Sequence, residues 1–584
     1  MQRRLGSGIG VHVHSVAKVL GVFLFFYSLS MLVPPLVGLF LEQESHPDSP
    51  FHPVRGFLLS TLLGCSFGSA LFFWGRRGKG EFFRKEGILV VASIWIFAGL
   101  IGALPYLFSG ALDFASGVFE ATSGLTTTGS STLGSAVTPR ISSLPKSLLF
   151  WRAQTHWMGG LGIVVMFLVF LPALGITEKT LFQAEVPGVS KEGLRPRIRQ
   201  SAQVLFWIYS GITLLLTLGF LYFGMDTFEA VCHSFATIAT GGFSTRDFSV
   251  GEFGSLGVEW VAILGMILAG TNFGLYYKLG SVWKRTMQSS RPLQLDPLLE
   301  PEEQRAPQRS PLLLPLHWLR RLPVFLKKGL QIFAGDPEFR FYLSTFVIGG
   351  LLIAGILWAQ SSLIDAKEEI GRLHDYGNLA ECLRDSSFQT ASLISSTGFA
   401  NSNLLTWPLL AQGLLILIML GGACGGSTGG GLKAARVLIL FKLLGRTIRK
   451  FLKPRSVEPL RLGGGKLEQE VIDSVLALFV AWVLILGAGT IAVLALEPDL
   501  DVYSCFTSVV TCLNNMGPGF TALVPGPEGS LIPANRAGID ICSYGSFGSF
   551  ADSSKYLLSL VMIFGRLEVY APLAILLPSF WREN

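Results

Sequence analysis

Four short polar segments are the part of this sequence best suited to chemistry. Each combines glycine with serine, threonine or asparagine, and none contains a charged side chain. Aligned on a shared glycine, they read Thr127-Thr128-Gly129, Ala239-Thr240-Gly241, Ser396-Thr397-Gly398 and Asn515-Met516-Gly517. A short, mostly apolar stretch containing small residues precedes each segment, which predicts a half-length helix that leads into a loop.

These residue types suit the passage of a cation. An ion that crosses a membrane must exchange its water for other oxygen ligands, and backbone carbonyls of an extended loop can supply them. Glycine reaches backbone angles that other residues resist. One such segment alone is more typical of an ordinary extramembrane turn, but four copies at matching positions favour a ring of carbonyls around one pore.

Other functional classes fit these segments less well. An intramembrane enzyme would need a nucleophile and a base on facing helices, and the segments hold no paired histidine or carboxylate. A receptor or scaffold subunit would need no repeated polar loop. The pattern therefore favours ion translocation.

A glycine-rich segment follows the third polar loop. Gly421–Gly431 lies between the apolar runs Leu414–Leu420 and Val437–Phe441, and it includes Gly425, Gly426, Ser427, Thr428, Gly429, Gly430 and Gly431. Each glycine costs a helix about 1 kcal/mol relative to alanine, so a broken helix and an intramembrane gating loop are predicted. The GKS or GKT of a phosphate loop is absent. A flexible kink without a gating function is the alternative.

Arg566 follows the apolar stretch Leu557–Phe564. An arginine inside a membrane costs at least about 2.5–3.5 kcal/mol on insertion scales. We therefore expect it to face a cavity or a partner such as Glu568, a plain structural Arg–Glu pair being the alternative. His156 is expected to pack or to form hydrogen bonds rather than to bind an ion.

Acidic residues flank the first two polar segments. They either concentrate cations at an outer mouth or complement the positive N-terminal ends of helices; these residues are Asp113, Glu120, Asp226 and Glu229.

The composition explains where such loops must sit. Of 584 residues, 50% are hydrophobic and only 15% are charged, and the mean hydropathy is +0.52. Soluble proteins average roughly 25% charged residues, and about 20 apolar residues span a bilayer as a helix. Val19–Leu41 is too long for a signal-peptide core and is interpreted as a retained first span. The chain is thus expected to be a multi-pass membrane protein in contact with the lipid bilayer.

The charge distribution orients these spans. Basic residues cluster in alternate loops, whereas Leu41–Pro53 contains no lysine or arginine. This positive-inside pattern places the N-terminus in the cytoplasm and explains the net charge of +7 without a nucleic-acid partner.

The predicted fold class is an all-α membrane protein. Two extra N-terminal transmembrane helices, near 16–41 and 56–75, precede four tandem helix–pore-loop–helix repeats around a pseudo-fourfold pore. The predicted units are an N-terminal extension (1–85), repeat one (86–178), repeat two (198–285), a cytoplasmic insert (286–337), repeat three with the intramembrane Gly-rich loop (338–452) and repeat four (467–584).

Seven cysteines without a CxxC pair imply neither a disulfide framework nor a zinc site. A single bridge remains open among Cys382, Cys505, Cys512 and Cys542.

Several strings together resemble the Trk/Ktr/HKT superfamily of cation transporters, and most closely its bacterial Trk-type potassium uptake membrane subunit. They are Trp151-Arg152-Ala-Gln-Thr-His-Trp157-Met-Gly159-Gly160-Leu-Gly162, the four polar segments, Gly421–Lys433 and Gly565-Arg566-Leu567-Glu568. The likeness runs from about residue 10 to 584. The insert near 288–335 and the loop at 521–554 look longer than the family pattern.

This resemblance carries functional expectations. It implies potassium uptake across the inner (plasma) membrane, with K⁺ as the transported ion, no enzymatic activity and no covalently bound cofactor. It implies a homodimer with one pore per subunit, and a cytoplasmic RCK-type nucleotide-binding regulatory subunit. Glycine in all four polar loops goes with potassium preference in this family.

The resemblance also assigns the gate. It implies that Lys433 and Arg566 act as electrostatic barriers below the filter, beside the Gly-rich loop. A sodium-permeable or sodium- or proton-coupled transporter of the same fold is the alternative function.

Overall fold

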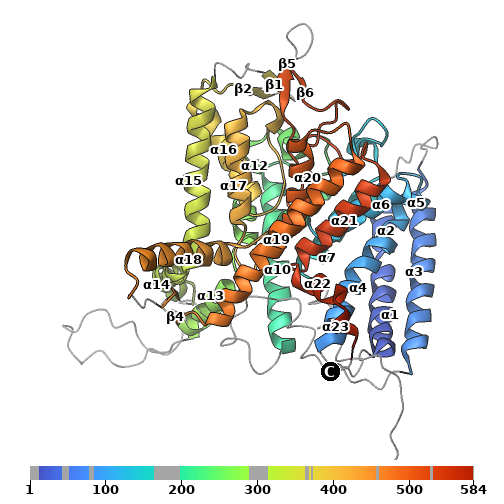
Figure 1. Ribbon diagram of the computed structural model, residues 1–584, viewed down its shortest axis with the longest axis horizontal. Coiled ribbons are helices and arrows are strands. Elements are labelled where there is room, and N and C mark those ends of the chain that lie inside the picture. The colour runs from blue at the N-terminus through green and yellow to red at the C-terminus, as the bar shows by residue number, and fades with distance from the viewer. Residues whose placement is uncertain are drawn as a thin grey trace, which may run out of the picture.

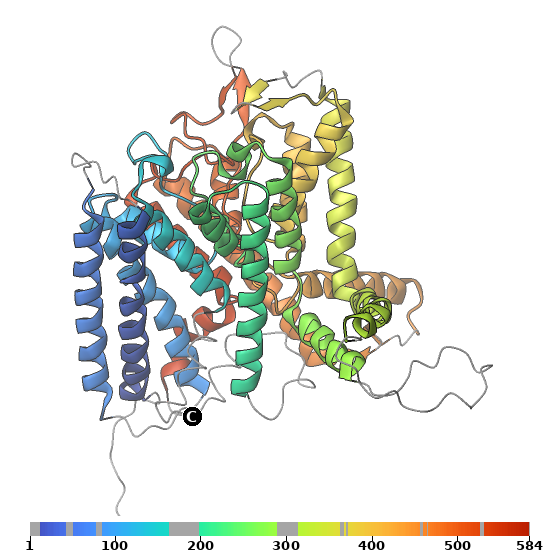
Figure 2. The same ribbon diagram turned by 180° about the vertical axis from the view of Figure 1, so that it is seen from behind.

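The computed structural model is a bundle of long helices with two small β-hairpins at one end and a third near the opposite end (Figure 1). Helices α1 and α3 lie at one edge of the bundle, and α15 lies at the opposite edge in both views (Figures 1 and 2). The residues described are 12–41, 51–77, 84–162, 198–288, 314–361, 367–369, 372–455, 459–463, 465–525 and 531–582.

Within these ranges, six spans are long and apolar enough to cross a membrane, or up to eight if two bent helix pairs each count as one span. A helix suits this environment because it pairs its backbone groups internally. The six are Val13–Leu41, Pro53–Gly75, Lys85–Phe108, Ala202–Tyr222, Pro337–Ala359 and Gln469–Leu496.

The first helices pack unusually closely. The helices expected near 16–41 and 56–75 are present as α1 (Val13–Ser30) with α2 (Val33–Leu41), and as α3 (Pro53–Gly75). A Cβ atom at Gly21 would lie 2.5 Å from the backbone nitrogen of Phe72, and one at Gly68 would lie 2.7 Å from that of Phe25. Small residues let helix backbones approach this closely in membranes.

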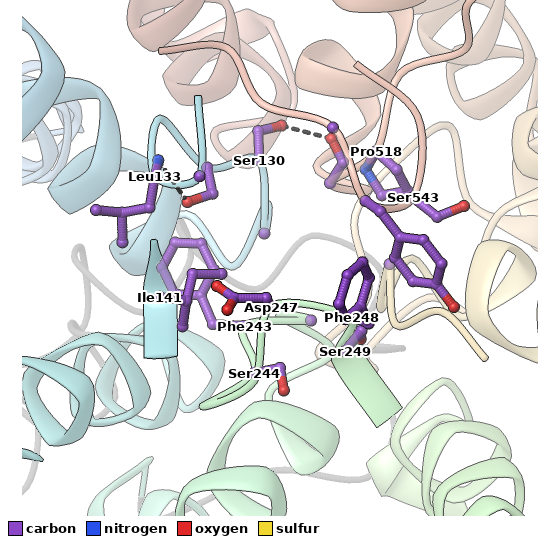
Figure 3. A pocket seen from close by; sticks show the side chains of 18 of the residues that line it. Ser130, Leu133, Ile141, Phe243, Ser244, Asp247, Phe248, Ser249, Pro518 and Ser543 are labelled. Atoms are coloured by element: carbon purple, nitrogen blue, oxygen red, sulfur yellow. Dashed lines mark hydrogen bonds between the residues drawn. The ribbon is translucent and has the colours of Figure 1, made fainter. Parts of the chain in front are cut away.

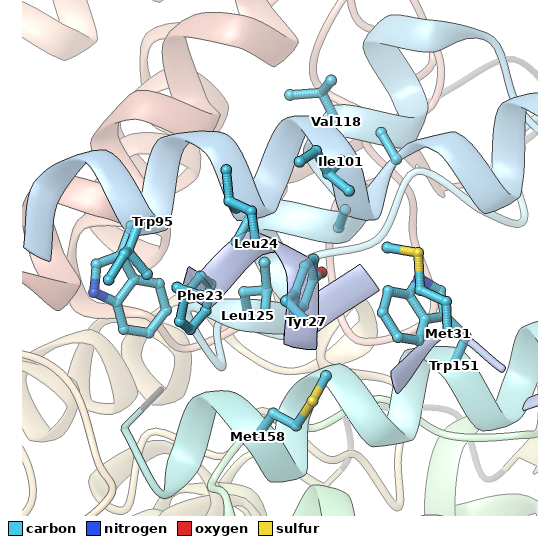
Figure 4. Close-up of a cluster of buried hydrophobic side chains, with 14 of the residues drawn as sticks. Phe23, Leu24, Tyr27, Met31, Trp95, Ile101, Val118, Leu125, Trp151 and Met158 are labelled. Atoms are coloured by element: carbon cyan, nitrogen blue, oxygen red, sulfur yellow. The ribbon is translucent and has the colours of Figure 1, made fainter. Parts of the chain in front are cut away.

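A hydrophobic cluster joins these helices to the next part of the chain (Figure 4). It includes Phe57 of α3, whose ring meets Trp151 edge-on at 6.2 Å. The chain around it forms α4 (Arg84–Gly102), α5 (Leu104–Phe108), α6 (Phe114–Leu125), a 3₁₀ turn (Ile141–Ser143) and α7 (Lys146–Gly160).

The middle of the chain forms a second cluster of helices. These are α10 (Ile198–Tyr222), α11 (Thr227–Ile238), a 3₁₀ turn (Ser249–Phe253), α12 (Leu256–Ala269) and α13 (Phe273–Gln288). Two further helices, α14 (Leu314–Gly335) and α15 (Pro337–Ala359), are separated by the single residue Asp336.

A hairpin of β1 (Lys367–Glu369) and β2 (Arg372–His374) pairs Glu368 with Leu373. It is followed by α16 (Leu379–Ile394), a 3₁₀ turn (Leu404–Thr406), α17 (Leu409–Gly421) and α18 (Ala434–Leu452). Helix α18 lies across the direction of the long helices (Figure 1).

The last part begins with a two-residue hairpin, β3 (Arg461–Leu462) and β4 (Gly465–Lys466). The following elements are α19 (Gln469–Leu496), α20 (Val502–Asn514), α21 (Asp552–Arg566), α22 (Tyr570–Leu576) and α23 (Pro578–Trp581). Strands β5 (Leu523–Pro525) and β6 (Leu531–Pro533) pair antiparallel between α20 and α21, with Val524 opposite Ile532.

Two helix pairs are bent sharply, in addition to the break between α17 and α18. Helices α12 and α13 meet at 91°, and α21 and α22 meet at 115°. Only the break at the Gly-rich segment was predictable from the sequence, since the other two bends carry no glycine run. At the second bend, Glu568 and Val569 have positive φ angles of 53° and 65°.

The faces of the long helices are apolar and exposed. Trp207 and Leu215 of α10 are 71% and 69% exposed, and Ile491 of α19 is 69% exposed. Exposed apolar patches of this extent mark contact with another apolar phase, which agrees with surfaces that face lipid.

Some predictions fall outside the described residues. They are the end of repeat one beyond residue 162 and most of the insert before residue 314. All seven cysteines are described and free, so the bridge left open by the sequence analysis is absent.

The Phe57–Trp151 contact generates a prediction. Replacing Phe57, which is fully buried, by alanine leaves a cavity between α3 and α7. We expect a loss of about 3 kcal/mol, the low end for Phe-to-Ala changes, because lipid rather than water surrounds the bundle. A thermal melt of the purified protein should show a lower Tm, while Phe40→Ala, at a site 78% exposed, should leave it unchanged. Equal melting of both variants would contradict the packing described here.

Candidate functional site

Four short, largely buried helices lead into the four polar segments. They are α6, α11, α16 and α20, and each begins at an Asp or Asn whose side chain accepts a hydrogen bond from a backbone N–H of the first turn. The capping residues are Asp113, Asp226, Asn378 and Asp501. Of the two roles considered for Asp113 and Asp226, this geometry favours the helix N-terminal one.

All four helices end in the same turn. The residue that starts the turn has left-handed backbone angles, with φ of 53° at Thr127, 55° at Thr240, 61° at Ser396 and 52° at Asn515. The next N–H bonds back to the carbonyl five residues earlier, over 2.8–3.0 Å: Thr128 to Ser123, Gly241 to Ala236, Thr397 to Ser392 and Met516 to Thr511. This is a Schellman turn, which usually holds glycine at its left-handed position.

The turn corrects the alignment of the second segment. Two residues beyond the left-handed position, each loop holds a glycine with φ of 82–87°: Gly129, Gly242, Gly398 and Gly517. The sequence analysis aligned Gly241 with the other glycines, which is one residue too early. Gly241 matches Thr128, and Ala239 is the helix C-cap. Two adjacent glycines made the sequence ambiguous, and the backbone angles resolve it.

The four loops close into a ring. A Cβ atom at Gly129 would lie 2.1 Å from the carbonyl oxygen of Gly241, one at Gly242 2.1 Å from that of Thr397, one at Gly398 2.4 Å from that of Met516, and one at Gly517 3.1 Å from that of Thr128. Each loop therefore contacts the next in cyclic order. The carbonyls involved belong to equivalent residues, so four equivalent backbone oxygens lie at the contacts between neighbouring loops.

A cavity of about 280 Å³ lies against this ring. The four positive-φ glycines all line it, and so do Ile541–Gly545 and Phe547. Figure 3 shows other lining side chains, among them Ser130, Asp247 and Ser543. Ser130 donates a hydrogen bond of 2.7 Å to the carbonyl of Gly517, which ties the first loop to the fourth.

Each short helix also holds the chain that returns from its loop. Glu120 accepts from the Thr132 N–H at 2.9 Å, His233 bonds Ser244 at 2.9 Å, and Gln389 donates to Asn401 at 3.2 Å. Thr507 accepts from the N–H of Phe520 at 3.1 Å. Chemically different side chains thus perform the same bracing role in the four loops.

The string Trp151–Gly162 connects the first loop to the second. Arg152 forms a buried ion pair with Glu120 at 2.8 Å and donates to the carbonyl of Ser244. His156 Nδ1 lies 2.7 Å from the carbonyl of Gly124, while its Nε2 accepts from the N–H of Phe243 at 3.2 Å. These two bonds require Nδ1 to carry the proton, so His156 is a hydrogen-bonding residue.

Two acidic residues near the cavity form ion pairs with arginines, whereas Asp247 accepts hydrogen bonds from Ser142. Glu120 is offset by Arg152, and Glu229 forms an ion pair of 2.5 Å with Arg246. Burial alone would lower the pKa of Arg246, but Glu229 and Glu252 outweigh it and raise the pKa. Among the described residues, no group of three or more His, Cys, Asp or Glu could hold a metal ion.

The Gly-rich segment lies directly beneath the loops. Thr428 donates to the carbonyls of Ile238 at 3.0 Å and Ala269 at 3.1 Å. The Gly430 N–H donates to Ser396 Oγ at 2.7 Å. A Cβ atom at Gly429 would lie 2.8 Å from the carbonyl of Ser395, and one at Gly430 would lie 2.5 Å from that of Asn514. Glycine is therefore required for this close approach.

The other predicted gate residues precede and follow the tip of the segment, Thr428–Gly430, along the chain. Gly425 donates to Glu338, Gly426 accepts from the Phe273 N–H, and Ser427 bonds the carbonyl of Cys424. Gly431 has a φ of 81°.

Arg566 reaches the same place from the end of α21. Its guanidinium donates to Thr127 Oγ1 at 3.1 Å, to the Thr428 carbonyl at 2.9 Å and to the Gly159 carbonyl at 2.6 Å. It therefore bridges the first polar loop and the Gly-rich segment. The observed ion pairs of Glu568 are with Lys433, at 3.0 Å, and with Arg436, not the Arg566 partnership suggested by sequence proximity. The chain bends between α21 and α22, so the side chains of Arg566 and Glu568 have different partners.

Sequence reasoning missed three parts of the site. Gly242 was hidden by its neighbouring glycine, and Glu338 gave no signal because its contacts are distant in sequence. The segment Ile541–Phe547 was noted only as part of a long loop, although its Gly and Ser content was a clue to close packing.

The chain is similar to known cation transport proteins. Residues 56–294 and 328–526 match the family model TrkH, described as a cation transport protein. The Trk system potassium uptake protein TrkH of Escherichia coli (strain K12) is 31% identical over 98% of this chain and 100% of its own length. TrkG of the same strain is 28% identical over 98% of this chain and 99% of its own length.

A solved structure is also similar. The crystal structure of the potassium transporter TrkH from Vibrio parahaemolyticus superposes with a TM-score of 0.73 at 29% identity, covering 98% of this chain and 100% of that chain.

The ring contact can be tested without a functional assay. Alanine at Gly242 would adopt a left-handed angle, at about 1–2 kcal/mol, and would press on Thr397, at about 1–3 kcal/mol for overpacking. We expect Gly242→Ala to lower the Tm of the purified protein by several degrees. The control is Gly211→Ala in α10, where a Cβ atom meets nothing within 4 Å and alanine favours the helix. If the Tm of Gly242→Ala is equal to or higher than that of Gly211→Ala, the corrected alignment is refuted.

Proposed function

The chain belongs to the TrkH family of cation transport proteins, and on this premise we propose that it mediates potassium uptake as the membrane subunit of a Trk-type system. The relatives named above are potassium uptake proteins, and the family is one of transport proteins rather than enzymes. The observation that carries the proposal is the cyclic contact of four equivalent loops within one chain.

The ring serves as the selectivity filter of a pore with pseudo-fourfold symmetry. The carbonyls of Thr128, Gly241, Thr397 and Met516 replace the water of a potassium ion, as carbonyl rings do in other channels. The bracing bonds behind each loop keep the carbonyls in place. The cavity lined by the four glycines is the outer entrance, where the ion arrives.

Each repeat then consists of a helix, a polar loop and a second helix, in the four predicted units 86–178, 198–285, 338–452 and 467–584. The N-terminal helices of 1–85 pack at the edge of the bundle and take no part in the ring. The described part of the insert, which contains α14, is assigned to the cytoplasmic end.

The Gly-rich segment and Arg566 form the gate below the filter. Arg566 and the Gly430 N–H occupy the hydroxyls of Thr127 and Ser396, which an ion leaving the filter would otherwise contact. The arrangement described here is therefore a closed one. Lys433 contributes less to the barrier than Arg566, because Glu568 offsets its charge.

The assembly follows the family. We propose a homodimer with one pore per subunit, in the inner (plasma) membrane with the N-terminus in the cytoplasm. A cytoplasmic RCK-type nucleotide-binding subunit would regulate the gate from the side where α14 and α18 lie.

The direct test of this function is uptake. Purified protein in vesicles should carry K⁺, or its analogue Rb⁺, in preference to Na⁺ under an imposed gradient. Equal Na⁺ flux would contradict potassium uptake and favour the sodium-permeable alternative. Flux that requires a Na⁺ or proton gradient would favour the coupled alternative.

The gate generates its own prediction. A unit charge at 4 Å changes the energy of a passing ion by about 1 kcal/mol in bulk water and by more where water is scarce. We therefore expect Arg566→Ala to raise Rb⁺ flux about fivefold or more. Arg340→Ala, which removes an exposed arginine of α15, is the matched control. Unchanged flux in Arg566→Ala vesicles would show that Arg566 is no barrier.

A further inference from the structure

The two ends of the Gly-rich segment are joined by a hydrogen bond between Ala434 and Ala423, and we call this joined part the base of the segment. The Ala434 N–H donates to the carbonyl of Ala423 at 2.9 Å, which brings the two ends of the segment together. Positive φ angles of 64° at Gly422 and 66° at Lys433 reverse the chain on either side. The contact between Ala423 and Ala434 thus fixes where the tip of the segment, Thr428–Gly430, lies relative to the polar loops.

One side chain from another helix, Glu338 of α15, forms hydrogen bonds with that base. Glu338 Oε1 accepts hydrogen bonds from the N–H of Gly425 at 2.5 Å and from the N–H of Ala435 at 3.0 Å. Ala435 is in the first turn of α18, where N–H groups lack helix partners and a negative charge is favoured by the helix dipole. A single carboxylate oxygen therefore joins the start of the segment to the helix that follows it.

Glu338 also connects the segment to the cytoplasmic insert. It lies in the first turn of α15, whose N-cap is Asp336, the residue directly after α14. Phe333 of α14 packs against Phe339 of α15 at 5.2 Å and against Tyr276 of α13 at 6.0 Å. A displacement of α14 thus acts on the helix turn that carries the carboxylate.

We infer that Glu338 is a positioning residue that holds the Gly-rich segment under the four loops, and that it transmits movements of α14 to this segment. The inference rests on the proposed gating function. Glu338 does not touch the ion path; it acts by fixing the base from which Thr428 and Gly430 reach the loops. Weakening its two bonds frees the tip and favours conduction.

A purely structural role has a different signature. If Glu338 only stabilised the start of α18, its loss would lower the Tm without exposing the segment. Cys424 distinguishes the two cases, because it adjoins Gly425 and is fully buried. Release of the segment should make its thiol accessible to N-ethylmaleimide, with the labelled peptide measured by mass spectrometry.

The experiment compares variants of the full chain in vesicles. A hydrogen bond to a charged group is worth enough to shift an equilibrium by about tenfold. We expect Glu338→Ala to raise both the Cys424 labelling rate and Rb⁺ flux by about tenfold. Glu338→Gln, which keeps an oxygen acceptor but loses the charge, should give an intermediate increase in both. The control Glu470→Gln changes an exposed glutamate in the first turn of α19 and should change neither.

The outcomes separate the inference from the function it rests on. Wild-type labelling and flux in Glu338→Ala would overturn the inference, and so would a lowered Tm without a change in labelling. Phe333→Ala should raise labelling less than Glu338→Ala; no increase would overturn the link to α14. If wild-type vesicles carry no Rb⁺ while Cys424 labelling still responds to Glu338, the transport function fails and the positioning role stands.

Discussion

The fold depends on one contact, repeated four times: a glycine of one polar loop against a backbone carbonyl of the next. Four irregular segments could not remain unpaired inside an apolar bundle, because buried backbone groups without partners cost too much. The Schellman turn provides donors for carbonyl groups at the end of each short helix. Beyond the turn, only glycine allows the backbone carbonyl of the neighbouring loop to approach this closely. The long helices exist in this account to hold the short ones in place.

Much of this was predictable from the sequence, because composition and repetition are global signals. The four segments, their preceding short helices and the two N-terminal helices stand where the residue patterns placed them. The exact register did not follow in the second loop, because Gly241 and Gly242 are equivalent until backbone angles are known. The sequence left open whether Arg566 faces a cavity or pairs with Glu568. The observed partners of Glu568 are Lys433 and Arg436, since nearness in sequence says little where a helix bends by 115°. Glu338 could not be found at all, since its contacts lie 87 and 97 residues away.

The loops are alike in backbone and unlike in side chain. The left-handed position holds Thr127, Thr240, Ser396 and Asn515, and each has a different partner. Thr127 meets Arg566, Ser396 meets Gly430, and Asn515 donates to Thr128 Oγ1. The main chain thus keeps the four loops equivalent. In the proposed function, the gate arises from the different side chains below the loops and from the glycine-rich break in a single helix.

In the proposed function, four loops of one chain enclose one ion path. Anomalous diffraction from crystals soaked in Rb⁺ can locate that path, because Rb⁺ substitutes for K⁺ and is located without reference to protein density. We expect a peak on the axis of the ring, among the carbonyls of Thr128, Gly241, Thr397 and Met516. A ring without a peak, with Rb⁺ bound instead at another place in the bundle, would contradict it.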